Sequence, residues 1–211
     1  MKTLDVITIG RSSVDLYGAQ VGGRLEDMAS FQKYVGGSPT NMATGTARLG
    51  LKSALITRVG NEHMGRFILE ELAKEGVDTR GVKTDPERLT ALVLLGIRDE
   101  KQFPLIFYRE NCADMALCED DIAEDYIAST RAVIATGTHL SHARTEAAVI
   151  KALKLARKFD QPEALGQLVL GAPKSFVAAR RAAHPNDDGL RAAHHRRVHG
   201  GAEPQLDSGR W

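Results

Sequence analysis

The fold is decided by one glycine-led stretch, Gly36-Gly37-Ser38-Pro39-Thr40-Asn41-Met42-Ala43. Its two glycines carry no Cβ, so the backbone can approach a ligand closely. The alternative is that the two glycines form a plain tight turn. Ser38 is a preferred N-cap residue and Pro39 suits the first helical position, so the stretch predicts the start of a helix. That helix is expected to end at about Leu49, because Gly50 follows. The amides at such a start are free to meet hydroxyl or anionic oxygens.

Strand-like and helix-like segments alternate on both sides of this stretch. Short apolar runs predict buried strands at residues 6–10, 53–60 and 132–136. Apolar residues at helical spacing predict helices over about 64–75 and 141–159. Such an alternation indicates a parallel sheet that is covered on both faces, so the predicted fold class is α/β.

A second structural unit is indicated within this alternation. Residues 91–97 and 103–108 are strand-like, and the polar turn 98–102 joins them. This pattern is typical of a β-hairpin.

The composition is that of an ordinary globular domain. The 211 residues are 43% hydrophobic and 26% charged, and the net charge of +1 favours neither a nucleic-acid nor a membrane partner. No apolar run reaches the ~18 residues of a membrane span, and the amino terminus lacks a signal peptide's apolar core. Cys112 and Cys118 are interpreted as reduced thiols, and a cytoplasmic protein is expected. No spacing of ligands predicts a metal site.

A polar motif, Gly10-Arg11-Ser12-Ser13-Val14-Asp15-Leu16-Tyr17, follows the first predicted strand. Asp15 is expected at or just beyond the carboxyl end of that strand, where open α/β sheets bind ligands. Its carboxylate could accept two hydrogen bonds from sugar hydroxyls, and the alternative is a solvated loop aspartate or a helix cap. Asn41, in the first turn of the predicted helix, could both donate to hydroxyls and accept from them.

The third motif is Phe107-Tyr108-Arg109-Glu110-Asn111-Cys112-Ala113-Asp114. Arg109 could bind a carboxylate or a vicinal pair of acceptors in a planar, bidentate geometry. The alternative is an arginine on an edge strand that is paired with a nearby acid such as Glu110.

Together these motifs resemble the ribokinase (phosphofructokinase B-type) family of carbohydrate kinases. The likeness runs from Gly36 through Asn41 and Gly50 to Gly60, and it covers about residues 4–159. It implies a ribokinase-like, Rossmann-type three-layer sandwich with a small β-lid, truncated in this chain. It also implies that a sugar is phosphorylated by ATP with Mg.

The resemblance assigns substrate binding to Asp15, Gly36, Gly37, Asn41 and Arg109. It places the lid at about residues 16–35 and 90–108, with Thr90 as a further candidate contact. The segment that begins at Gly60 departs from the family pattern at Asn61 and Glu62, so no site role is predicted for those two residues.

The opening motif and the segment around Arg109 most resemble the 5-dehydro-2-deoxygluconokinase branch of the family. That branch implies a small-molecule substrate, a keto-deoxy sugar acid of inositol catabolism. Fructokinase and 2-keto-3-deoxygluconate kinase fragments, or a non-catalytic sugar-binding remnant, remain alternatives.

The catalytic half that the resemblance implies has no counterpart in the sequence. Family members carry a late Gly-Ala-Gly-Asp stretch, in which the aspartate is the base and the glycine amides stabilise the transferring phosphate. The late glycine segments here, at Gly166, Gly171 and Gly200-Gly201, lack that acid. No catalytic residue is therefore predicted, the ATP site is expected to be absent, and little or no turnover is expected.

The character of the sequence changes after Phe159. Residues 160–211 contain four of the seven histidines and four of the seven prolines, but no isoleucine. One interpretation is a flexible basic extension, and the favoured one is a change of reading frame or an equivalent truncation near residue 160. We therefore predict a kinase segment at 1–159 and an aberrant or disordered tail at 160–211. The incomplete sheet would expose an edge, so self-association through this edge or the lid is expected.

Overall fold

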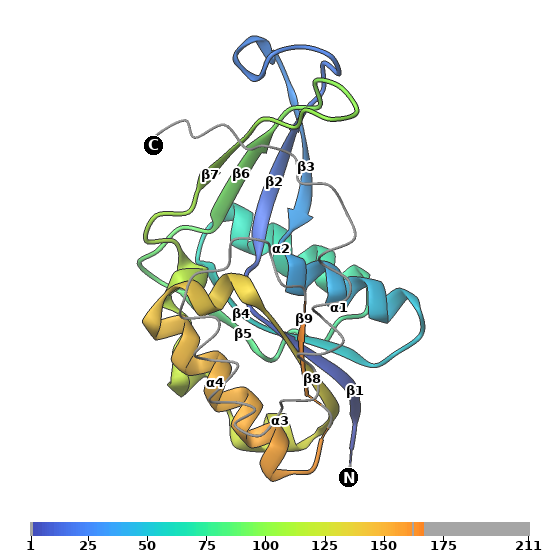
Figure 1. Ribbon diagram of the computed structural model, residues 1–211, viewed down its shortest axis with the longest axis vertical. Coiled ribbons are helices and arrows are strands. Elements are labelled where there is room, and N and C mark those ends of the chain that lie inside the picture. The colour runs from blue at the N-terminus through green and yellow to red at the C-terminus, as the bar shows by residue number, and fades with distance from the viewer. Residues whose placement is uncertain (1, 162, 167–211) are drawn as a thin grey trace, which may run out of the picture.

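The computed structural model describes residues 2–161 and 163–166. Its core is a five-stranded sheet with the order β5-β4-β1-β8-β9, in which every neighbouring pair is parallel (Figure 1). The strands are β1 (Leu4–Ile9), β4 (Ser53–Gly60), β5 (Val82–Asp85), β8 (Thr130–Thr136) and β9 (Glu163–Gly166). The three strands predicted from apolar runs are confirmed.

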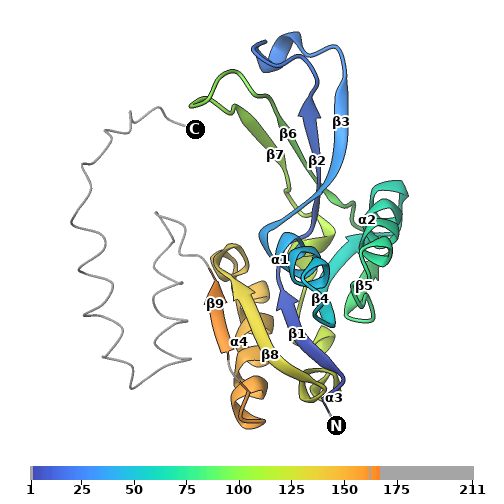
Figure 2. The same ribbon diagram turned by 90° about the vertical axis from the view of Figure 1, so that its right-hand side faces the viewer.

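Four α-helices cover the described sheet, two on each face. Figure 2 shows α1 and α2 on one side of the sheet and α3 and α4 on the other. Their bounds are α1 (Ser38–Arg48), α2 (His63–Lys74), α3 (Glu124–Ala128) and α4 (Ala143–Lys158). Short 3-10 turns are η1 (Leu25–Asp27), η2 (Ala113–Ala116), η3 (Glu119–Asp121) and η4 (Gly137–Ser141). The three-layer α/β architecture is confirmed.

The alternation of side chains along β4 explains the two helix layers. Leu55 and Val59 pack in the apolar cluster on the α1 and α2 side, whereas Ala54 and Ile56 pack with α4 on the other side. Because successive residues of a strand point to opposite faces, a run of apolar residues can serve both layers at once.

A second sheet of four strands, with the order β3-β2-β6-β7, stands beyond the carboxyl ends of the core strands (Figure 1). It is made of β2 (Ser13–Gly18), β3 (Phe31–Gly36), β6 (Ala91–Leu95) and β7 (Leu105–Tyr108). The antiparallel pairs β2–β3 and β6–β7 are joined by a parallel pairing of β2 with β6. We call this unit the lid sheet. It contains the hairpin predicted at 91–108.

The predicted start of α1 is wrong by one residue. Gly37, with φ 103° and ψ 127°, is the N-cap, and Ser38 is already helical. A Cβ on Gly37 would overlap the carbonyl of Arg11, so both the conformation and the close approach require glycine. The hydroxyl of Thr40 donates to the same carbonyl at 3.1 Å, which fixes the helix start against the β1–β2 link.

The segment after Phe159 is described only in part. Strand β9 pairs in parallel with β8 and extends the core sheet, although the sequence pattern did not identify it. The strand-like run at 169–171 and the helical turns expected at 176–183 lie outside the described residues. The boundary at residue 159 and the nature of the tail stay predictions.

Within residues 2–161 and 163–166, no helix combines the length and the apolar character that a membrane crossing requires. No group of three or more His, Cys, Asp or Glu side chains there is arranged to hold a metal ion. Cys112 and Cys118 are both free.

Candidate functional site

The order of the core strands locates the candidate site. The chain leaves β1 toward β4 and β5 on one side, and it later returns to add β8 and β9 on the other. The junction between β1 and β8 is therefore the switch point, where ligands of open α/β sheets bind beyond the carboxyl ends of the strands. The lid sheet stands beyond these carboxyl ends (Figure 2).

Asp15 lies on β2 of the lid sheet rather than in a loop. It pairs with Tyr34 of β3 and with Val93 of β6, and Val93 in turn pairs with Phe107 of β7. Directly paired residues point to the same face of a sheet, so these side chains form one row. The neighbouring Val14 belongs to the opposite face, which packs on α2. We call the face with Asp15 the inner face of the lid sheet.

Gly36 makes room for the Asp15 side chain. A Cβ on Gly36 would overlap the Asp15 carboxylate, which accepts a hydrogen bond from the Ser13 hydroxyl at 3.0 Å. Burial raises the pKa of the Asp15 carboxyl, while the Ser13 hydrogen bond and the Arg11 charge act in the opposite direction. The structure thus brings Asp15, Gly36 and Gly37 together at the base of the lid sheet.

Arg109 is engaged by an acid, but that acid is Asp114 and not Glu110. Its Nε donates to Oδ2 of Asp114 at 2.7 Å, and its Nη2 lies 2.7 Å from the same oxygen, unaligned for a hydrogen bond. Asp114 is buried, and burial raises its pKa against the opposing effect of Arg109. The pair holds Arg109 in place, and a substrate contact of Arg109 stays a prediction.

Beneath this pair lies a buried histidine that the sequence pattern did not single out. His139 is fully buried, and its Nε2 donates to the carbonyl of Asp114 at 3.1 Å. Burial, aided by the positive charges of Arg109 and Arg11, lowers the pKa of His139 to about 3, so the ring is neutral. A Cβ on Gly10 would lie 3.5 Å from its other nitrogen, Nδ1.

Several buried polar atoms of the residues that follow β1, of η2 and of the end of β8 and η4 lack a hydrogen-bond partner among the described residues. They are Nε of Arg11, Oγ of Ser12, Oδ1 of Asp114, Oγ1 of Thr136 and Nδ1 of His139. Unpaired buried polar atoms are costly and require an explanation, such as a ligand or an ordered water. They come from three separate segments, so no single sequence motif contains them all.

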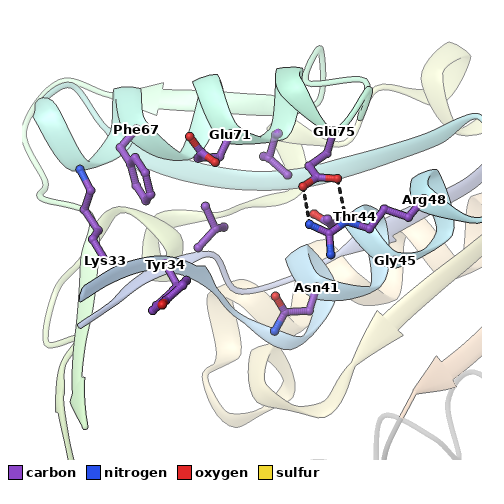
Figure 3. Close-up of a pocket in the computed structure, with 11 residues that line it drawn as sticks. Lys33, Tyr34, Asn41, Thr44, Gly45, Arg48, Phe67, Glu71 and Glu75 are labelled. Carbon is purple, nitrogen blue, oxygen red and sulfur yellow. Dashed lines mark hydrogen bonds and ion pairs between the residues drawn. The ribbon is translucent and has the colours of Figure 1, made fainter. Parts of the chain in front are cut away.

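Asn41 lies in a different environment. It is exposed on α1 and lines a cavity of about 660 Å³ between α1, α2 and β3. Figure 3 shows the Arg48–Glu75 ion pair at one end of this cavity and Lys33 beside Phe67 at the other. The Nζ of Lys33 lies 3.9 Å from the centre of the Phe67 ring. A sugar contact of Asn41 stays a prediction.

Thr90 and Glu62 serve the start of α2. The hydroxyl of buried Thr90 accepts from the amide of Gly60 at 3.0 Å, and its own amide donates to Glu62 at 3.1 Å. Glu62 also accepts from the amides of Met64 and Gly65 as the N-cap of α2. This structural use is consistent with the absence of a predicted site role for Glu62, and it leaves the contact of Thr90 with substrate a prediction.

Comparison with known proteins identifies the family of this chain. A family model described as the pfkB family of carbohydrate kinases matches residues 3–195. The chain belongs to this family. A protein named 5-dehydro-2-deoxygluconokinase from Listeria monocytogenes is 39% identical over 160 residues, which are 75% of this chain and 49% of that protein.

Solved pfkB structures share the fold. The PfkB protein from Polaromonas sp. JS666 matches with a TM-score of 0.78 and 31% identity, over 87% of this chain and 62% of that one. An uncharacterized sugar kinase from Pyrococcus horikoshii, in complex with ATP, matches with a TM-score of 0.75 and 28% identity, over 84% and 59% of the two chains. The chain spans about half the length of the curated relatives it matches.

Proposed function

We propose that this chain is the sugar-binding portion of a pfkB kinase whose substrate is a keto-deoxy sugar acid of the 5-dehydro-2-deoxygluconate type. The observation that carries the proposal is Asp15, a partly buried carboxylate on the inner face of the lid sheet, beside the switch point of the core sheet. Carboxylates short of donors suit sugar hydroxyls, which supply them.

The other predicted residues complete a half-site in this proposal. Gly36 brings the backbone close to the Asp15 carboxylate, and Gly37 lies against Arg11. Asn41, which lines the cavity between α1, α2 and β3, is proposed to add an amide from the first turn of α1. Arg109 supplies a planar guanidinium for the carboxylate of the sugar acid. The similarity to 5-dehydro-2-deoxygluconokinases supports the choice of a sugar acid over a neutral sugar.

ATP, with Mg, is the proposed phosphate donor of the whole enzyme. The described residues do not fit an ATP site of the implied kind, because none of their late glycines is followed by an aspartate at a helix start. Gly171 and Gly200-Gly201 lie outside the described residues. We derive no step through ATP, and we predict little or no turnover by these 211 residues.

Calorimetry with 5-dehydro-2-deoxygluconate tests the proposal. We expect Asp15→Ala and Asn41→Ala each to lower the affinity at least about 10-fold, which corresponds to about 1.4 kcal/mol of binding free energy. Asp27→Ala is the matched control, because Asp27 is an exposed carboxylate near the lid tip that is paired with Arg24. An unchanged affinity in Asp15→Ala would contradict the proposed site, and robust ATP-dependent phosphorylation would contradict the predicted lack of turnover.

Fructose and 2-keto-3-deoxygluconate, measured in the same way, separate the alternative substrates. A cytoplasmic location and self-association remain predictions. The four residues of β7, each 45–56% exposed, support an association through the lid sheet.

A further inference from the structure

Arg11 occupies the link that carries the chain from the core sheet into the lid sheet. It follows Gly10 at the end of β1 and precedes β2. Its backbone is held on two sides, since its carbonyl accepts from Thr40 at 3.1 Å and lies against Gly37. The position of Arg11 is therefore set by the same contacts that set the start of α1.

The side chain of Arg11 lies on the inner face of the lid sheet. Its guanidinium carbon is 5.2 Å from the centre of the Phe107 ring, a distance typical of a cation–π contact. Phe107 is in the same row as Asp15, because both are in register with Val93. Arg11 and Asp15 therefore share one face, to which the sugar is proposed to bind.

The two arginines near this face differ in how their side chains are hydrogen-bonded. Arg109 has its own acid, Asp114, whereas the buried Nε of Arg11 has no hydrogen-bond partner within the described part of the chain. Burial and the nearby charge of Arg109 lower the pKa of Arg11, and Asp15 and Asp114 only oppose that effect. A partly buried guanidinium with an unpaired N–H favours an acceptor oxygen supplied by a ligand.

We propose that Arg11 determines specificity for an acidic sugar by binding the carboxylate together with Arg109, while Asp15 binds hydroxyls. The inference rests on the proposed function and adds Arg11 to Arg109 as a second cation that binds the carboxylate of the substrate. A guanidinium offers two parallel N–H groups to a carboxylate, so the pair of arginines selects a sugar acid over a neutral ketose.

Affinities of Arg11→Gln, Arg11→Lys and wild type for 5-dehydro-2-deoxygluconate and for fructose test this inference. Loss of a charged hydrogen-bond partner is expected to weaken binding of the sugar acid in Arg11→Gln by about 10-fold to 100-fold. Binding of fructose is expected to change less than about 3-fold, because fructose has no carboxylate. Arg11→Lys keeps the charge but not the planar fork, so it is expected to fall between the other two proteins.

Arg24→Gln is the matched control, because Arg24 lies near the tip of the lid and its side chain is 63% exposed. An Arg11→Gln variant that binds the acid as tightly as wild type, or that loses both sugars equally, overturns the inference. If Arg11→Gln fails to fold, Arg11→Lys decides in its place, and wild-type affinity for the acid overturns the inference. Failure of the wild type to bind either sugar overturns the proposed function and, with it, the role of Arg11.

Discussion

The two helices on one face of the core sheet begin in opposite ways. At the start of α2, Glu62 accepts hydrogen bonds from the amides of Met64, Gly65 and Thr90. At the start of α1, the N-cap is Gly37, and no side chain of the described residues caps the helix. We call the start of α2 closed, because a carboxylate caps its amides, and the start of α1 open, because no described side chain does so.

The carboxylates near the two helix starts differ in how many hydrogen-bond donors they have. Burial alone would raise the pKa of Glu62, but hydrogen bonds from Thr90, Met64 and Gly65 lower it overall. Burial does raise the pKa of Asp15, because Ser13 and Arg11 compensate only in part. The glycine at the start of α1 is therefore not what distinguishes the candidate site. The informative feature is a carboxylate that the fold leaves short of donors.

Substitution of Gly37 is expected to break the open start most severely. Gly37→Ala places a side chain at φ 103° and against the carbonyl of Arg11, so we expect a loss of about 3 kcal/mol or more of unfolding free energy. Gly50→Ala is the matched control, since Gly50 has φ 86° but open space around it, and about 1 kcal/mol is expected there. Urea denaturation measures both, and equal losses would refute the role of the close approach.

Acid should destabilise the fold through His139 of η4 before it does so through Glu62 at the start of α2. The folded-state pKa of His139 is about 3, below its ordinary value of 6.5, so the unfolded chain takes up the proton first as the pH falls. Stability is therefore expected to fall by up to about 1.4 kcal/mol per pH unit below pH ~6.5, and this loss continues down to the folded-state pKa. Glu62 has its pKa lowered from 4.5, so its stabilising contribution is lost only at more acidic pH.

His139→Gln separates these two effects. Glutamine can still donate to the carbonyl of Asp114, but it takes up no proton, so the dependence of stability on pH between about 6.5 and 4.5 should flatten. Denaturation at several pH values measures the slope. A slope in His139→Gln as steep as that of wild type would show that another group is responsible.

Removal of the cap charge is expected to have the smallest effect. Glu62→Gln keeps the shape but loses the charge that three amides share, so we expect a loss of about 2 kcal/mol with little change in sugar selectivity. Glu71→Gln on the same helix is the control for stability, because its pair with Lys74 is near the surface and is expected to contribute little. Thermal unfolding measures the loss of stability in both variants. Calorimetry measures their affinity for the sugar, and a lower affinity in Glu62→Gln would show a role of Glu62 in binding.

Local patterns predict local structure in this chain. The buried strands 53–60 and 132–136 were found because a continuous apolar run is sufficient evidence for a strand with both faces covered. The sequence pattern does not predict strand β5 (Val82–Asp85), because it is an edge strand of only four residues and most of them are polar. The placement of Asp15 within a strand depends on its pairing with β3 and β6, which no single segment shows.

The candidate site shows the same limit. Asp15, Gly36 and Gly37 were identified because their motifs are contiguous in the sequence. The alternative for Arg109, pairing with a nearby acid such as Glu110, names the kind of partner but not the residue, since the chain path through η2 brings Asp114 to it instead. Burial of His139 likewise results from tertiary packing, and a lone histidine carries no period that would reveal it.

The parallel pairing of β2 with β6 has a consequence for how the chain acquires its structure. Each antiparallel pair of the lid sheet joins strands close in the chain, whereas the β2–β6 contact joins Ser13 to Ala91 across β4, α2 and β5. Closing such a long loop costs entropy that only prior folding of the intervening segment reduces. We therefore expect the surface that carries Asp15, Val93 and Phe107 to assemble late, after much of the core has reached its native topology.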